Sequence, residues 1–386
     1  MAARVTGAGD VAPLARAATV APAARAASVA PSVPALATAG AAARRARRLG
    51  WWTIVALVVL AGSLLVGVLV GPAHLPVRGL FGELLDRLPF VRVHSGLTPT
   101  QRGVLVDLRL PRVVLGALVG CTLSASGATF QGVFRNPLAD PYLLGSAAGA
   151  GLGATLVIVY THGHSHWAID PLPLAAFVGA LVAMLIAYGL GAAADRSRSS
   201  ASILLAGVAV ASFFTAVQTY VQQRHSDVLR EVYSWILGRL VSSGWGDVRL
   251  VFPYVAVTSA VLIAGRRHLD VMRVGDDEAN AVGLNVRRAR LVLVITASLG
   301  TAAVVAVSGL IGFVGIIVPH AVRLLTGSSY RRLLPLSMIF GAAFLVLADV
   351  AARTIQAPAE LPIGVVTAFF GAPFFLVVLR TRQGLR

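Results

Sequence analysis

Long apolar stretches alternate with short polar segments along most of the chain. A helix that crosses the hydrocarbon core of a bilayer needs about 20 apolar residues, with a range of about 17 to 25. Ten stretches come close to this length, which predicts an all-α polytopic membrane protein of about ten transmembrane helices per subunit. The predicted spans are residues 51–70, 113–131, 143–160, 172–194, 203–221, 248–264, 291–308, 310–325, 333–352 and 363–379.

The first 48 residues differ in composition from the rest. Residues 1–43 are mostly Ala, Val, Pro, Gly and Ser with scattered Arg, and such a segment buries too little apolar area to repay its ordering. We expect a disordered cytoplasmic tail at 1–48 and a transmembrane domain at 49–386. The basic box at 44–48 resembles the start of a signal peptide. The long apolar stretch behind it, with no evident cleavage site, favours a first transmembrane helix.

The arginines are distributed unevenly between the two sides that ten spans define. Twenty-two of the 33 fall on the side of the two termini, mainly in the tail, the connection 265–290 and the C-terminal segment. Because cytoplasmic loops carry an excess of basic residues, both termini are predicted to be cytoplasmic. The formal net charge of +17 is therefore explained by topology, which makes nucleic-acid binding the weaker interpretation.

Composition and motifs argue against an enzyme. Only 13% of the residues are charged, every basic residue is Arg, and Cys121 is the single cysteine. A chain without lysine has no P-loop lysine and no Schiff-base lysine, and one cysteine makes no disulfide framework or cysteine-based zinc site. No nucleophile elbow and no metalloprotease motif occur. We expect no cofactor on this chain, and any ATP and Mg²⁺ to be bound by another chain.

One loop has the spacing of a metal site. His162, His164 and His166 alternate in the predicted outward loop 161–171, and imidazole is a common metal ligand. A solvated loop is the simpler interpretation, so the three histidines remain weak candidates and no metal site is predicted.

Charged residues near the outward helix ends form a second candidate site. Arg109 and Arg112 precede the second span, and Asp349 and Arg353 are four residues apart near the end of the ninth, followed by Glu360. Four-residue spacing allows Asp349 and Arg353 to pair on one helix face. The arginines could simply snorkel toward the lipid interface. Alternatively, their planar guanidinium groups could bind carboxylates of a docking partner.

Two inward segments carry a further pattern. Residues 135–141 separate two spans with paired prolines, and Asn136 can cap the freed backbone groups or simply complete a turn. Residues 275–284 predict a short amphipathic helix with acidic residues at its start and Gly283 as its C-cap. Acidic residues disfavour contact with anionic lipid, so we expect this helix to dock a soluble partner.

Several motifs carry a family resemblance. They include Arg109-Leu-Pro-Arg112, Asn136-Pro-Leu-Ala-Asp-Pro141, Gly309-Leu-Ile-Gly-Phe-Val-Gly315 and Glu360-Leu-Pro-Ile-Gly364. From about Trp51 to Arg380 the sequence closely resembles the FecCD-type permease subunits of ABC importers for iron-siderophore, haem and cobalamin, the type II importers. The resemblance does not cover the N-terminal tail.

The resemblance implies partners and roles for single residues. It implies a dimer with a second copy or a similar permease, two cytoplasmic ATPase subunits and an extracytoplasmic substrate-binding protein. The permease itself would lie in a bacterial cell membrane. The implied roles are docking of the binding protein for Arg109, Arg112 and Arg353, ATPase coupling for Asp277, Glu278, Ala281, Gly283 and Leu284, and the cytoplasmic gate for Asn136, Leu138, Ser199 and Ser200.

The function predicted from all these observations is import by alternating access. The chain would be a transport subunit and not an enzyme, taking a ferric siderophore or a related iron chelate, with cobalamin or haem as alternative cargo. A secondary transporter without an ATPase partner is the rival class, but such carriers bury ionisable residues at mid-membrane. The few ionisable residues here lie near predicted helix ends.

Overall fold

A computed structural model describes residues 35–73, 75–86, 96–161, 170–194, 200–240 and 244–383. The chain divides into two compact units, Met1–Ala46 and Arg47–Arg386. In the first unit the described residues, 35–46, are helical. They belong to helix α1 (Ala35–Leu69), which therefore begins inside the segment expected to be a tail. The second unit is described below.

Ten apolar helices account for the ten predicted stretches. Seven helices in the described part of the chain are long and apolar enough to cross a membrane, and three more are apolar but shorter. The polytopic all-α fold is thereby confirmed. The ten are α1, α4 (Leu110–Val133), α5 (Ser146–Thr161), α6 (Pro171–Ala194), α7 (Ser200–Arg224), α9 (Trp245–Met272), α11 (Val286–Ser308), α12 (Val314–Thr326), α13 (Tyr330–Thr354) and α14 (Ile363–Gln383).

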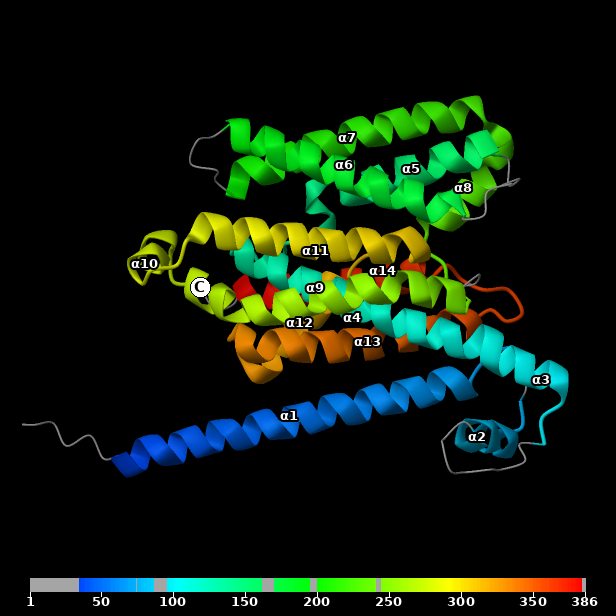
Figure 1. Cartoon of the computed structure of the whole chain (residues 1–386), viewed down its shortest axis with the longest axis horizontal. Coiled ribbons are helices and arrows are strands. Elements are labelled where there is room, and N and C mark those ends of the chain that lie inside the picture. Colours follow the sequence, from blue (N-terminus) through cyan, green and yellow to red (C-terminus); the bar gives the residue numbers. More distant parts are fainter. Residues whose placement is uncertain are drawn as a thin grey trace, which may run out of the picture. The chain divides into compact units, whose positions relative to one another are not determined.

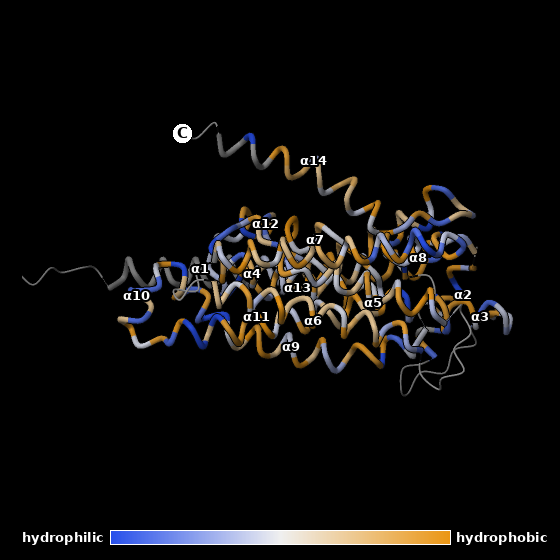
Figure 2. The backbone as a smooth tube through the Cα atoms, turned by 90° about the horizontal axis from the view of Figure 1, so that it is seen from above, coloured by the Kyte–Doolittle hydropathy of each residue, from blue (hydrophilic) through white to orange (hydrophobic). Residues whose placement is uncertain are grey.

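Short helices lie at both ends of this bundle. Both views place α2 (Val77–Asp86), α3 (Pro99–Gly103) and α8 (Leu229–Ile236) at one end, called the outer end below (Figures 1 and 2). The opposite or inner end carries α10 (Asp276–Ala281) and the last residues of α14. The arginine distribution predicts that the inner end is cytoplasmic.

Helix α4 lies at the centre of the unit and packs against α9, α11, α12 and α13. In the segment Pro99–Val133, 78% of the apolar window is buried, compared with 22% in α1 and α7. The backbone of α4 touches that of α13, because a Cβ on Gly120 would lie 2.2 Å from the Gly341 carbonyl oxygen. Small residues at such crossings let membrane helices approach closely.

The predicted span 310–325 is not a single helix, which corrects that boundary. Helix α12 begins only at Val314 and has 13 residues, so it is about 20 Å long and cannot cross a bilayer alone. Non-helical backbone at membrane depth is tolerated where protein surrounds it and satisfies its polar groups. The Tyr142 hydroxyl does this by donating to the Ile311 carbonyl at 3.1 Å and accepting from the Ile311 amide at 3.3 Å.

Candidate functional site

At the outer end, Arg112 binds two carboxylates at once. Its Nε and Nη2 donate to Asp349 Oδ1 at 3.0 and 2.8 Å, and Nη1 and Nη2 donate to the two oxygens of Glu360 at 3.0 and 2.9 Å. The side chain of Arg112 is 12% exposed and that of Asp349 is 2% exposed. Bidentate pairs of this kind are strong when they are shielded from water. Arg112 therefore ties α4 to α13 and to the residues before α14.

Arg353 and Arg109 instead hold the end of α1. Arg353 Nη2 donates to the Gly67 carbonyl at 2.5 Å, and its Nε lies 3.5 Å from Asp349 Oδ2. Arg109 donates from Nη1 to the Val68 carbonyl at 3.1 Å and from Nη2 to the Ala73 carbonyl. The last carbonyls of a helix lack intrahelical partners and form the negative end of its dipole, so two buried guanidinium groups cap α1.

The three arginines predicted for docking are thus gathered at the outer end, as expected, but each is bound within the chain. Their role in docking stays a prediction. The expected pairing of Asp349 with Arg353 on one helix face is present. Glu360, which the sequence places with these charges at the outward end, joins the cluster through Arg112, although the two residues are 248 positions apart.

At the inner end, the segment 135–141 forms a capped turn. Asn136 Oδ1 accepts the Leu138 amide at 2.9 Å, and Asp140 Oδ1 accepts the Tyr142 amide at 2.8 Å. Burial raises the pKa of Asp140 to about 6, against the lowering effect of this hydrogen bond. The turn is the simpler of the two interpretations offered for Asn136, and it leaves the gate role as a prediction.

Arg135, the first residue of that turn, connects it to α10. Its backbone has a φ of 50°, a left-handed conformation that is costly for a residue with a side chain. From this position the guanidinium donates to the Met272 carbonyl at 2.8 Å and to Asp276. Asp276 also accepts from Arg290 of α11 at 2.8 Å. Sequence reasoning missed Arg135, Asp276 and Arg290, because only the fold brings them together.

Helix α10 occupies the predicted position and is short. Asp276, Asp277 and Glu278 form its first turn, where negative charge suits the helix dipole. Gly283 has a φ of 87° and ends the helix, and the Leu284 amide returns to the Ala279 carbonyl at 3.0 Å. Asp277, Glu278, Ala281 and Gly283 are exposed. Its role in coupling stays a prediction.

Other predicted residues lie outside the described part of the chain. Ser199 is one of them, and for Ser200 only the backbone at the start of α7 is described. His162, His164 and His166 also lie outside the described residues. Within the described residues, no group of three or more His, Cys, Asp or Glu side chains is arranged to hold a metal ion.

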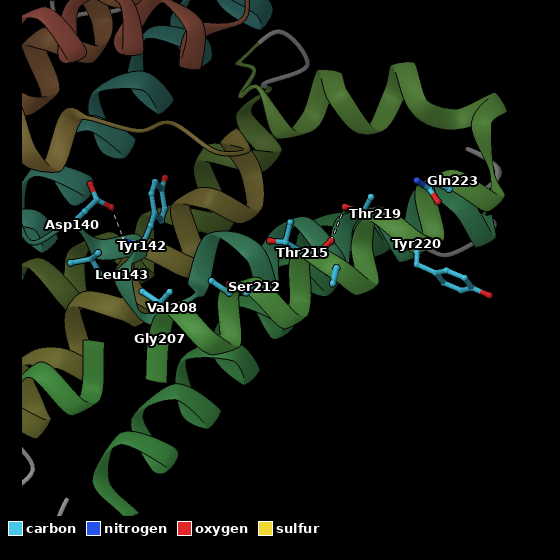
Figure 3. A pocket seen from close by; sticks show the side chains of 12 residues that line it. Asp140, Tyr142, Leu143, Gly207, Val208, Ser212, Thr215, Thr219, Tyr220 and Gln223 are labelled. Atoms are coloured by element: carbon cyan, nitrogen blue, oxygen red, sulfur yellow. Dashed lines mark hydrogen bonds between the residues drawn. The ribbon is translucent and has the colours of Figure 1, made fainter. Parts of the chain in front are cut away.

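An open groove of about 890 Å³ runs along α7 (Figure 3). Ser212, Thr215, Thr219 and Gln223 follow one another along the helix, and Asp140 and Tyr142 close the groove's inner end. Its described lining contains one acid and no basic residue. The full lining is Asp140, Tyr142, Leu143, Gly207, Val208, Ala211, Ser212, Thr215, Ala216, Thr219, Tyr220 and Gln223.

Comparisons with known proteins agree with this architecture. The chain is 38% identical over 362 residues to the cobalamin import system permease protein BtuC of Halobacterium salinarum, covering 86% of this chain and 96% of the relative. It is 34% identical over 335 residues to the iron(3+)-hydroxamate import system permease protein FhuB of Bacillus subtilis, covering 86% and 84%.

A solved structure gives the same result. The chain is similar to a transporter described as metal-chelate type and solved in an inward-facing conformation, with a TM-score of 0.72 and 28% identity over 85% of this chain and 98% of the other. The model of the FecCD transport family matches residues 56–381. The bundle of apolar helices described above is therefore a membrane permease subunit of an ABC importer, and the chain belongs to the FecCD transport family.

Proposed function

We propose that this permease imports a ferric siderophore or a related iron chelate by alternating access. Cargo is handed over at the outer end by an extracytoplasmic binding protein and passes along the α7 groove. Two ATPase subunits at the inner end, contacting α10, drive the change between outward and inward openings.

The lining of the α7 groove carries this proposal. It presents a row of hydroxyl and amide side chains along α7, and it holds no basic side chain in its described part. Apart from Asp140 at its inner end, such a surface offers neutral hydrogen bonds to a polar chelate. A transport path needs weak contacts of this kind, because tight binding of the cargo would slow its release. The named iron-hydroxamate and metal-chelate relatives support the same cargo class.

The faces of α7 and α14 support a second permease copy as partner. Leu205, Val208 and Phe213 of α7 are 58–70% exposed, and Phe369 of α14 is 74% exposed. A second copy facing the groove would enclose it and convert it into a path between two subunits.

Cobalamin is the second candidate cargo. The cobalamin permease relative covers as much of this chain as the iron-hydroxamate relative and is slightly more identical to it. Haem is a third possibility of the same transport class.

The experiment compares cargo directly. The permease is reconstituted in proteoliposomes with its ATPase and binding-protein partners, and uptake of labelled ferric siderophore, haem and cobalamin is measured with and without ATP. We expect ATP-dependent uptake of the ferric siderophore. Uptake of cobalamin or haem alone would overturn the cargo, and uptake that persists without ATP would overturn the mechanism.

One substitution tests the groove itself. Thr219 donates to the Thr215 carbonyl at 2.9 Å, and Thr354 of α13 makes the same bond to Val350 at 2.7 Å away from the groove. Thr219→Val removes a groove hydroxyl worth about 1 kcal/mol, so we expect uptake to fall about fivefold. Thr354→Val serves as the matched control and should leave uptake unchanged. Equal effects in the two variants would contradict the assignment of the groove.

A further inference from the structure

A second groove lies on the outside of the bundle, between the inner ends of α9 and α11. It has a volume of about 330 Å³. Its residues on α9 are spaced three and four apart, as are those on α11, so each helix presents one continuous face. The lining is Val261, Ala264, Gly265, His268, Leu284, Asn285, Arg288, Ala289, Val292 and Leu293.

The groove changes character along its length. Ala264 and Val292 are exposed and line its apolar part. Gly265 contributes no side chain, and a Cβ there would lie 2.6 Å from Leu293 Cδ2. At the inner end the walls become basic, with His268 on α9 and Arg288 on α11.

His268 and Arg288 at this mouth differ from three arginines of the inner end that have partners within the chain. Arg135, Arg290 and Arg273 donate to carboxylates or carbonyls within the chain. The side chains of Arg288 and His268, in contrast, are exposed and make no hydrogen bond or ion pair with any described residue. The nearby side chains of Arg267 and Arg287 are exposed as well. Exposed arginines are therefore gathered at the inner end of the apolar groove, and Arg288 among them has no counter-ion within the described residues.

We propose that this groove binds an anionic phospholipid. One acyl chain lies against Val261, Ala264 and Val292, and the phosphate accepts hydrogen bonds from Arg288 and His268. The outer surface of a membrane helix meets hydrocarbon at this depth, and basic pockets between transmembrane helices on the cytoplasmic side bind acidic headgroups. The proposal rests on the membrane location alone and not on the cargo or on ATP coupling.

The test uses the full chain in nanodiscs that contain equal amounts of phosphatidylglycerol and phosphatidylcholine. Lipid retained by the protein after transfer to detergent is counted by native mass spectrometry. The wild type should retain phosphatidylglycerol in preference to phosphatidylcholine. Arg288→Gln should reduce that preference about fivefold, since one basic residue contributes on this scale to binding an anionic surface. High salt should weaken the preference further.

Two further variants keep the proposal falsifiable. Val292→Trp fills the apolar part and should abolish retention of phosphatidylglycerol, and unchanged retention would overturn the site. Arg331→Gln removes the same charge from an exposed position on α13 at the inner end, outside the groove. If it lowers the preference as much as Arg288→Gln, only general surface charge is at work. Loss of ATPase-subunit binding in Arg288→Gln with unchanged lipid retention would assign these cations to the ATPase and likewise overturn the proposal.

Discussion

Arg112 shows how one residue can decide the stability of the outer end. Its guanidinium pairs with Asp349 and Glu360 at the same time. Arg112→Glu would place a third carboxylate against two, and breaking a shielded ion pair costs about 3 to 5 kcal/mol. We expect a marked fall in the thermal unfolding temperature of the purified permease.

The matched control is Arg78→Glu, because Arg78 is an exposed arginine of α2. It should change the unfolding temperature little, since exposed charges contribute about 0 to 1 kcal/mol. Equal stability of the two variants would contradict the role given to Arg112. The unfolding temperature also limits any docking experiment. A loss of binding-protein docking in Arg112→Glu is informative only at temperatures where the variant is folded.

Asp140 makes stability depend on pH. Its pKa is raised from 3.8 to about 6 on folding. A raised carboxyl pKa means that the protonated form is favoured in the folded state, so the contribution to stability is full below about pH 4 and is lost as the pH rises through about 6. Relative to Asp140→Asn, the wild type should lose about 1 kcal/mol of unfolding free energy between pH 5 and pH 7. Parallel pH profiles of the two proteins would refute this.

Sequence reasoning at the residue scale reached only local partners. Asp349 and Arg353 were predicted to pair because they share one helix face. The bonds from Arg112 to Glu360 and from Arg109 to the carbonyls of α1 could not be predicted, since they join segments far apart in the chain. A carbonyl acceptor also leaves no trace in the residue type.

Among the elements, α10 and the turn that begins at Arg135 are joined by charge. Arg135 and Asp276 have side chains 40% and 41% exposed, so their pair should add at most about 1 kcal/mol to stability. The pair should matter for coupling ATP hydrolysis to transport, because it connects α10, the predicted ATPase contact, to the turn that contains the predicted gate residue Asn136. In Arg135→Gln we expect uptake per ATP hydrolysed to fall about tenfold, a usual size for coupling between sites.

Arg273→Gln is the control for this prediction. Arg273 is also about half exposed at the inner end, but it donates to Ser328 in the connection between α12 and α13 and not to α10. Its variant should keep the ratio of uptake to ATP hydrolysis. An unchanged ratio in Arg135→Gln, with wild-type uptake intact, would reject the link while leaving the proposed function in place.

The elements themselves were mostly predictable, since a run of about 20 apolar residues has few alternatives to a membrane helix. The non-helical segment before α12, at residues 310–313, was not predictable in this way. Residues 310–325 are mostly apolar and interrupted only by His320 and Arg323. The backbone at Ile311 can stay outside the helix because the Tyr142 hydroxyl supplies it with a hydrogen-bond partner. Hydropathy does not register such tertiary partners.

For the whole molecule, the orientation in the membrane is the property to test. Val282, beside α10, is 73% exposed, and Tyr233 of α8 is 53% exposed. In a Cys121→Ala background, Val282→Cys should react with a membrane-impermeant thiol reagent only from the cytoplasm, and Tyr233→Cys only from outside. The reverse pattern would invert the predicted topology. Labelling from both sides would show a leaky preparation, which an impermeant dye identifies.

The arginine caps on α1 have a consequence for biogenesis. The ribosome makes α1 first among the apolar helices, yet Arg353, which binds the Gly67 carbonyl, emerges 286 residues later. Until α13 is synthesised, the outer end of α1 lacks this partner, and Arg109 is the one of the two capping arginines already present. A chain that ends before α13 therefore lacks the later of the two arginine caps on α1.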